Sequence, residues 1–209
     1  IRLYQKINIL LQDGWSMEYK LESFYTVKQF DQHSFLKDRL LKEINHTENK
    51  SLKNKDDYYS DSINRLDWHD NCNFEREWVK VIYKDLNNFF NKVFKILGYD
   101  DCLIKNIWFQ QYKEHGTHGW HTHGHTFTGA YYLDLPKDSP CTQIIVPANQ
   151  NKLITLVAKE GDISIFPSYT IHRSPINKTK STKTIISFNL EIGKPTKEIL
   201  NQIDRLSNE

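Results

Sequence analysis

Histidine side chains, which can bind metal ions, are concentrated in one short stretch of the sequence. Five of the nine histidines lie within eleven positions, namely His115, His118, His121, His123 and His125. Side chains two residues apart on a strand face the same side, so the spacing offers two candidate ligand pairs, His121/His123 and His123/His125. For His115 and His118 we expect local hydrogen bonding instead. Imidazole suits Fe, Zn, Cu or Ni, so these residues alone leave the metal open.

A further histidine, far along the chain, is suited to complete such a site. His172 lies in the run GDISIFPSYTIHRSP, in which a strand starts at Gly161 and ends at Phe166 and Pro167. We interpret the turn that follows as a hairpin that brings His172 to the mouth of a barrel. A third imidazole from a neighbouring strand would complete one face of a coordination sphere and leave the remaining positions open.

A lysine begins the strand that comes after this turn. Lys183 is the first residue of KTIISFNL, and alternation places it on the same face as Ile185 and Ser187, which points a cation into the barrel. A buried cation is costly unless it meets an anion. The alternative is a lysine at the start of a strand that reaches solvent.

The first half of the chain predicts mixed structure that ends in helices. Residues 18–30 alternate well enough for an extended segment, and Ser34 is placed to cap a short helix over 35–45. Residues 46–72 are polar and aperiodic, and we interpret them either as a lid over a site or as a disordered insertion. Apolar residues at three- and four-residue intervals predict a long helix over 74–97.

The second half changes to short segments that are rich in β-branched and aromatic residues. Six such strands are predicted, over residues 103–112, 127–135, 142–147, 152–158, 162–166 and 182–192. Strands at this spacing indicate a small sandwich or barrel. A helix over 196–206 is predicted to close the chain. The sequence therefore predicts one α+β domain over 1–209, with mainly helical support in 1–102, a strand-rich core in 103–193 and a C-terminal helix in 194–209.

Charge, hydropathy and cysteine content exclude several classes of protein. The chain has 28 basic and 26 acidic residues and a net charge of +2, which argues against a dedicated nucleic-acid surface. No apolar stretch approaches the ~18 residues that a membrane span needs. A cytoplasmic protein is therefore the expectation. The three cysteines are odd in number and scattered, so they predict neither a disulfide framework nor a zinc module.

Three separate motifs, in this order, resemble the iron(II)/2-oxoglutarate-dependent dioxygenases. They are QQYKEHGTHGWHTHGHTFTGAYYLDLP, GDISIFPSYTIHRSP and KTIISFNL, and the resemblance covers residues 106–191. The branch that the chain resembles most is the small oxygenases of marine bacteria and phages. The resemblance implies a double-stranded β-helix core (a jelly roll, as in cupins) with supporting N-terminal helices.

The metal motif of this superfamily is His-X-Asp/Glu followed by a distant histidine. It falls here on His121 and His123 and then on His172, so the resemblance implies that these three residues bind Fe(II). The sequence departs from the motif because His123 stands at the carboxylate position. A face of three imidazoles carries one negative charge less than a face of two histidines and a carboxylate. The metal centre is then more positive, which favours an anionic cosubstrate and weakens the retention of Fe(II). Three-histidine iron sites occur in some cupin-class dioxygenases.

The resemblance also implies a site for 2-oxoglutarate. Lys183 falls on the basic position that pairs with the far carboxylate of this cosubstrate, which would answer the cost of burying a cation. Tyr112, Tyr132 and Ser187 are candidates to hydrogen-bond it. The implied reaction is hydroxylation of a substrate by O2, coupled to oxidative decarboxylation of 2-oxoglutarate to succinate and carbon dioxide, with one oxygen atom entering the alcohol and the other succinate.

Two other functions fit parts of the pattern. A cupin-type three-histidine metalloenzyme without 2-oxoglutarate fits the histidines but gives Lys183 no role. A non-catalytic β-sandwich that binds structural zinc fits less well, because structural zinc usually has four protein ligands and often cysteine. The substrate of the oxygenase is expected to be a small molecule or a peptide, and no residue identifies it further.

Overall fold

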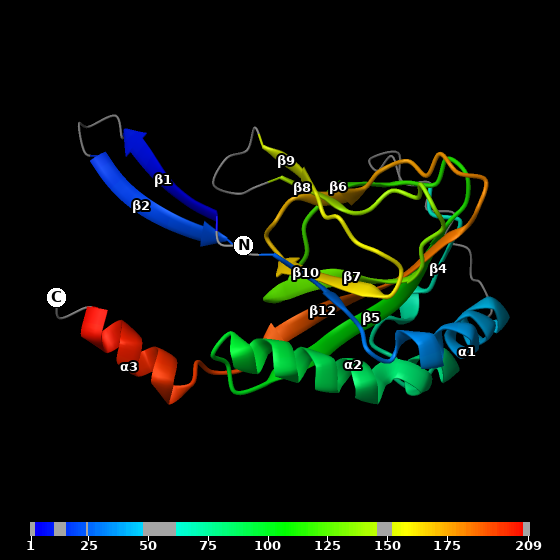
Figure 1. The fold of residues 1–209 in the computed structure, drawn as a ribbon, viewed down its shortest axis with the longest axis horizontal. Coiled ribbons are helices and arrows are strands. Elements are labelled where there is room, and N and C mark those ends of the chain that lie inside the picture. The colour runs from blue at the N-terminus through cyan, green and yellow to red at the C-terminus, as the bar shows by residue number, and fades with distance from the viewer. Residues whose placement is uncertain (1–2, 11–15, 24, 48–61, 146–151, 207–209) are drawn as a thin grey trace.

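The computed structural model describes residues 3–10, 16–23, 25–47, 62–145 and 152–206 (Figure 1). The helices are α1 (His33–His46), the 3-10 turn η1 (Trp68–Asp70), α2 (Glu77–Ile96) and α3 (Lys197–Leu206). The strands are β1 (Leu3–Leu10), β2 (Ser16–Ser23), β3 (Thr26–Gln29), β4 (Arg65–Leu66), β5 (Cys102–Tyr112), β6 (His118–His121), β7 (Phe127–Asp134), β8 (Gln143–Ile145), β9 (Leu153–Thr155), β10 (Asp162–Pro167), β11 (His172–Ser174) and β12 (Lys183–Ile192). No helix among the described residues is long and apolar enough to cross a membrane.

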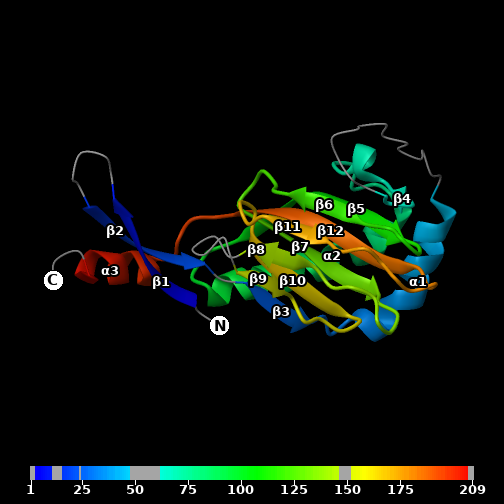
Figure 2. The ribbon, with the colours of Figure 1, turned by 90° about the horizontal axis from the view of Figure 1, so that it is seen from above.

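Two antiparallel sheets form the core of the fold. The larger sheet has six strands in the order β3-β10-β7-β12-β5-β4, and the smaller has four in the order β6-β11-β8-β9. The two sheets lie as separate layers, one above the other in Figure 1, and they overlap when seen from above in Figure 2. Neighbours in the larger sheet come from distant parts of the sequence, as in the pairing of Lys183 with Tyr112 between β12 and β5. The predicted sandwich or barrel is therefore confirmed as two facing sheets, and β1 and β2 pair with each other as a hairpin.

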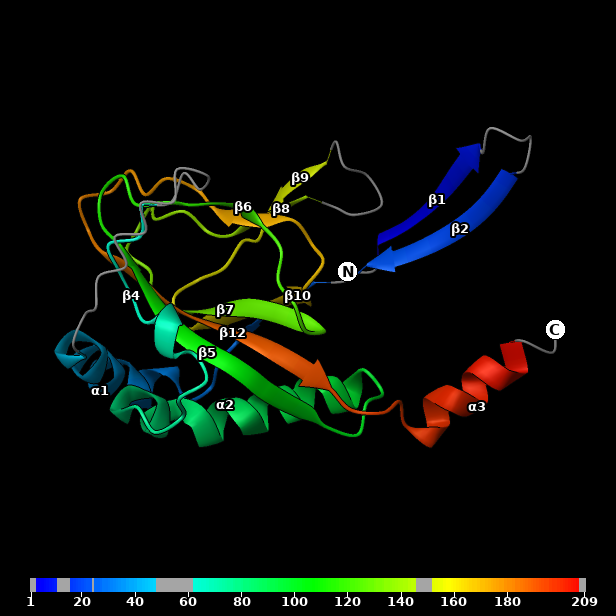
Figure 3. The same cartoon turned by 180° about the vertical axis from the view of Figure 1, so that it is seen from behind.

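The helices α1 and α2 cover the outer face of the larger sheet (Figure 3). The centre of the apolar stripe of α2 is fully buried there, while its edges are partly buried. Its rings pack on those of the strands, as Phe90 does on Phe188 with ring centroids 4.5 Å apart. On α1, Lys37 donates hydrogen bonds to Asp134 at the end of β7 and to Glu160, at 3.1 and 2.7 Å. The apolar periodicity thus predicted α2 to within three residues at each end, and Gly98 follows it at a φ of 88°. One face of the larger sheet therefore packs on helices, and the other face is available to form a site between the sheets.

Three details differ from the sequence-based predictions. Ser34 lies inside the first turn of α1, because the helix begins at His33 and Gln32 occupies the cap position without a side-chain hydrogen bond. The turn after β10 is not a hairpin, since β10 belongs to the larger sheet and β11 to the smaller one. It therefore carries the chain from one layer to the other. The short strands β4, β6 and β11 were not predicted, and the division of the chain into one domain stays a prediction.

Part of the polar excursion 46–72 is firmly packed, while its residues 48–61 lie outside the described part of the chain. Asp67 is 2% exposed and accepts hydrogen bonds from the guanidinium of Arg76, from the indole of Trp78 at 2.9 Å and from the backbone N–H of Phe109 at 2.7 Å. Arg76 also donates to the carbonyl oxygen of Ile107 at 2.6 Å. We call Asp67 and Arg76 the latch. It joins η1, the start of α2 and the middle of β5.

Replacing Asp67 by Ala is expected to lower the free energy of unfolding by about 3–5 kcal/mol, because it leaves the buried charge of Arg76 without its partner. Urea unfolding followed by circular dichroism measures this. Asp38→Ala on the exposed face of α1 is the control and should change the stability little. Equal stability of the two variants would show that the latch does not hold the fold.

Candidate metal and cosubstrate site

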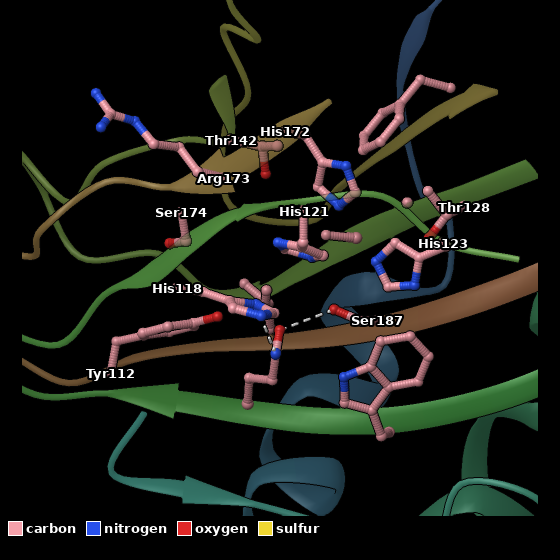
Figure 4. Close-up of a pocket in the computed structure, with 16 residues that line it drawn as sticks. Tyr112, His118, His121, His123, Thr128, Thr142, His172, Arg173, Ser174 and Ser187 are labelled. Atoms are coloured by element: carbon pink, nitrogen blue, oxygen red, sulfur yellow. Dashed lines mark hydrogen bonds between the residues drawn. The ribbon is translucent and has the colours of Figure 1, made fainter. Parts of the chain in front are cut away.

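Three histidines from the smaller sheet and the turn after it lie close together between the two sheets (Figure 4). His121 ends β6 and pairs directly with His172 on β11, while His123 follows β6 by two residues. Each offers one ring nitrogen, and these three atoms lie within 4.8 Å of one another. Among the described residues, no carboxylate or cysteine joins this group. The structure thus brings together the set that the resemblance implied.

Backbone carbonyls fix the orientation of two of these rings. Nδ1 of His121 lies 2.7 Å from the carbonyl oxygen of Gly119, and Nδ1 of His172 lies 2.9 Å from that of Thr170. A carbonyl oxygen can only accept, so Nδ1 carries the proton in each ring and Nε2 keeps its lone pair. Metal-binding histidines commonly show this arrangement, in which the outer nitrogen donates and the inner nitrogen binds the ion.

His123 is held in a different way. Its backbone N–H donates to the carbonyl oxygen of Ser168 at 3.0 Å, which ties the residue to the turn before β11. Its ring is stacked on the indole of Trp108, with centroids 5.8 Å apart and planes inclined by 27°. The side chain therefore meets an aromatic surface of β5, in the opposite sheet.

Burial keeps the imidazoles of His123 and His172 neutral. It lowers the pKa of His123 to about 3 and holds the pKa of His172 well below its usual value, and the neighbouring histidines lower both further. The neutral ring is the form that binds a metal ion, so no proton has to leave before an ion can enter. The three imidazole donors, two of which burial keeps neutral, fit a transition metal of the kind bound by imidazole.

The cluster opens into a hollow between the sheets with a volume of about 370 Å³, including its open mouth. Its walls combine the histidines with aromatic, hydroxyl and amide side chains. They are formed by Trp108, Gln110, Tyr112, His118, His121, His123, Thr128, Gly129, Ala130, Thr142, Phe166, His172, Arg173, Ser174, Ile185 and Ser187. Two of the predicted cosubstrate residues, Tyr112 and Ser187, therefore line the hollow. Ser187 donates a hydrogen bond to Gln110 at 3.0 Å.

Lys183 is 1% exposed, so the alternative in which it reaches solvent is wrong. Its ammonium group donates to Ser174 Oγ at 2.7 Å and to the carbonyl oxygen of Pro140 at 3.0 Å, and it lies 4.5 Å from the ring centre of Tyr112. Within the described residues it forms no salt bridge. Burial lowers its pKa to about 8, with a smaller opposing effect from Cys141. A buried cation without a carboxylate partner is suited to receive an anionic ligand.

Tyr132 lies beside the hollow rather than on its wall. Its side chain is fully buried, and its hydroxyl donates to Thr142 Oγ1 at 2.9 Å while it accepts from the backbone N–H of Thr142 at 3.2 Å. Thr142 does line the hollow. The hydroxyl of Tyr132 therefore reaches the site through Thr142.

The other histidines of the run, His115, His118 and His125, differ in whether they reach the site. For His118 we expected local hydrogen bonding, but its side chain lines the hollow. Its ring is stacked on that of His121 with centroids 3.8 Å apart, and its Nδ1 lies 3.4 Å from Gln110 Nε2. His125 points elsewhere, with Nδ1 3.4 Å from a carboxylate oxygen of Glu191, so the pair His123/His125 does not form. His115 contributes backbone contacts, including a hydrogen bond from its N–H to Asn177 at 2.7 Å. Trp108 and Gln110 were not predicted as site residues, although they share one face of β5 with Tyr112 because side chains alternate along a strand.

Comparisons with known proteins agree with this site. Residues 106–189 match the model of a family described as "Putative 2OG-Fe(II) oxygenase". No curated protein sequence matches the chain. The chain is similar in structure to the viral collagen prolyl hydroxylase of Paramecium Bursaria Chlorella virus-1, with 17% identity, a TM-score of 0.55 and coverage of 82% of this chain and 97% of that chain.

Two further solved structures share the fold. A prolyl-4-hydroxylase of Pseudomonas putida has 13% identity and a TM-score of 0.53, with 79% of this chain and 91% of that chain covered. The alpha ketoglutarate dependent epimerase SnoN from nogalamycin biosynthesis has 11% identity and a TM-score of 0.61, with 82% and 77% covered. The chain thus shares the jelly-roll fold of these structures, in the α+β class with the helices α1 and α2 packed against it. Residues 106–189, which contain His121, His123 and His172, are thus also the part of the chain that is similar in sequence to this family.

Proposed function

We propose that His121, His123 and His172 hold Fe(II), that Lys183 binds a carboxylate of 2-oxoglutarate, and that the enzyme hydroxylates a small molecule or a peptide. The observation that carries this assignment is the combination of a three-imidazole face with a buried lysine in the same jelly roll. Ser174 connects the two parts, because it lies two residues beyond His172 and accepts a hydrogen bond from Lys183. Bound Fe(II) and 2-oxoglutarate would supply the oxidising chemistry, while the chain supplies orientation and a site screened from water.

Three more side chains are proposed to orient the cosubstrate. Tyr112 lies against Lys183, Ser187 lines the same wall through its contact with Gln110, and Tyr132 acts through Thr142. Hydroxyl groups of this kind can donate to carboxylate oxygens, and such charge-assisted hydrogen bonds are stronger than neutral ones. Together with Lys183 they would favour an anion over a neutral ligand.

An anaerobic titration tests the proposal. Fe(II) is added to the apo-protein, then 2-oxoglutarate, and the visible charge-transfer band of the chelate is recorded. We expect the band to appear at one equivalent of each ligand. Iron binding without the band would favour the cupin-type enzyme, in which Lys183 has no role. Absence of metal binding would favour the non-catalytic module.

The affinity for 2-oxoglutarate is expected to fall as the pH rises above about 8, where Lys183 begins to lose its proton. Only the protonated lysine pairs with the anion, so the dissociation constant should rise by about tenfold per pH unit above the pKa. The stability of the apo-protein changes with pH in the opposite direction to the affinity. The burial-lowered pKa means that protonated Lys183 destabilises the apo-protein below pH 8, and this is relieved as the pH approaches 10.5.

Isothermal titration with 2-oxoglutarate on either side of this pH measures the effect, with Zn(II) or Mn(II) replacing iron to prevent oxidation. The titratable neighbours of the lysine are Tyr112 and Cys141. An affinity that does not change across this range would contradict the pairing.

The setting of the reaction is also part of the proposal. A cytoplasmic enzyme that acts on a small molecule or a peptide, without a dedicated nucleic-acid surface, agrees with the nearly balanced charge of the chain. Fractionation of the native cells tests the location.

A further inference from the structure

We propose that Trp108 is a positioning residue that fixes the ring of His123 for metal binding, and that the latch of Asp67 and Arg76 holds Trp108 in place. The inference rests on the proposed metal site, and it concerns how this chain orients its unusual third ligand. His123 stands where a carboxylate is usual, and a ring has to be turned correctly before its nitrogen can bind.

The three rings of the cluster are oriented by different means. His121 and His172 each donate from Nδ1 to a backbone carbonyl oxygen, at 2.7 and 2.9 Å. Among the described residues, no hydrogen bond fixes the ring of His123. Its ring is stacked on two others, His172 with centroids 5.0 Å apart and an inclination of 19°, and Trp108 with centroids 5.8 Å apart and an inclination of 27°. Of these two, only Trp108 is not itself a proposed metal ligand. A buried indole surface restricts the rotation of a neighbouring ring, so this stack can do for His123 what the carbonyl oxygens do for the other two.

Trp108 is itself held from both sides along the chain. The carbonyl oxygen of Ile107 accepts from Arg76 at 2.6 Å, and the N–H of Phe109 donates to Asp67 at 2.7 Å. These bonds are on the backbone immediately before and after Trp108, and both partners belong to the latch. The position of this part of β5 therefore depends on a charged pair on the helix side of the sheet.

A second contact supports the indole from the solvent side. Trp68, the residue after Asp67, meets Trp108 edge to face, with ring centroids 4.4 Å apart and planes at 84°. Trp68 is 40% exposed, whereas Trp108 is 2% exposed. The indole of Trp108 is thus enclosed between Trp68 and His123, and the same segment that supplies the latch supplies this wall.

The test compares the metal affinity of the full chain and its variants, measured from the visible absorption of Co(II). Trp108→Leu removes the flat surface but keeps an apolar side chain, and Trp108→Phe restores a ring. We expect Trp108→Leu to weaken Co(II) binding by about tenfold, within the range found for loss of groups that orient metal ligands. We expect Trp108→Phe to bind Co(II) nearly as tightly as the wild type.

Phe94→Leu is the matched control, because Phe94 is fully buried and packs against Phe127 of β7 on the helix face of the larger sheet, with ring centroids 4.9 Å apart. It should lower the melting temperature and leave Co(II) affinity unchanged. If Trp108→Leu does not fold, Trp108→Met replaces it. Equal Co(II) affinity of wild type and Trp108→Leu, or equal losses in the Leu and Phe variants, would overturn the inference while leaving the metal site intact. Failure of the wild type to bind Co(II) would overturn both.

Discussion

Replacing His172 by Ala is expected to abolish stoichiometric metal binding and, with it, turnover of 2-oxoglutarate. Loss of a group that only orients a ligand costs about 10–100-fold in metal affinity, so loss of the ligand itself should cost more than about 100-fold. His172 is 7% exposed and sits at the pairing with His121, where a neighbouring side chain or a water molecule cannot easily take over its place. Fe(II) binding under anaerobic conditions, measured by competition with a chelator, and succinate production measure the two effects.

His125→Ala is the matched control for this prediction. His125 belongs to the same run of histidines, but its ring is directed at Glu191 and lies outside the cluster. It should therefore bind Fe(II) as the wild type does. Loss of metal binding in both variants would indicate that the run acts as a loose set of ligands. Retention of Fe(II) by His172→Ala would show that the ion is held elsewhere.

Much of the larger sheet could be predicted because its long strands are buried and rich in β-branched and aromatic residues. The strands β5, β7, β10 and β12 appear where the sequence places them, within about two residues. The short strands β6 and β11 have no such signature. β6 contains glycine and histidine, and β11 contains histidine and arginine. They are strands through tertiary pairing, β6 with β11 and β11 also with β8.

The parts of the candidate site that depend on the alternation of side chains along one strand could be predicted. Two histidines in alternate positions and a lysine in step with Ile185 and Ser187 are visible in the sequence, and the structure places them near one hollow. The latch was not predictable, because Asp67 lies in a polar segment without periodicity. Its importance comes from burial against β5, which depends on contacts between residues 42 positions apart in the sequence.

Replacing Lys183 by Met is expected to weaken the binding of 2-oxoglutarate by roughly 10- to 150-fold, which corresponds to the loss of one hydrogen bond to a charged group. Met has a similar length and no charge, so it removes the cation with little change in packing. It also removes the cost of burying the ammonium group, which offsets the hydrogen bonds lost at Ser174 and Pro140. The variant should therefore stay folded and still bind metal. Isothermal titration of the metal-loaded protein with 2-oxoglutarate gives the affinity.

Two comparisons separate the role of this charge from a general effect on the fold. Lys194→Met removes an exposed lysine beyond the end of β12 and should leave the affinity for 2-oxoglutarate unchanged. In Lys183→Met the loss of affinity above about pH 8 should disappear as well, because the group that titrates there is gone. An enzyme that loses neither affinity nor this pH dependence would bind 2-oxoglutarate through other residues, and the buried lysine would then be a feature of the fold alone. If both are lost together while metal binding persists, the charge of Lys183 is what selects a dicarboxylate as the cosubstrate.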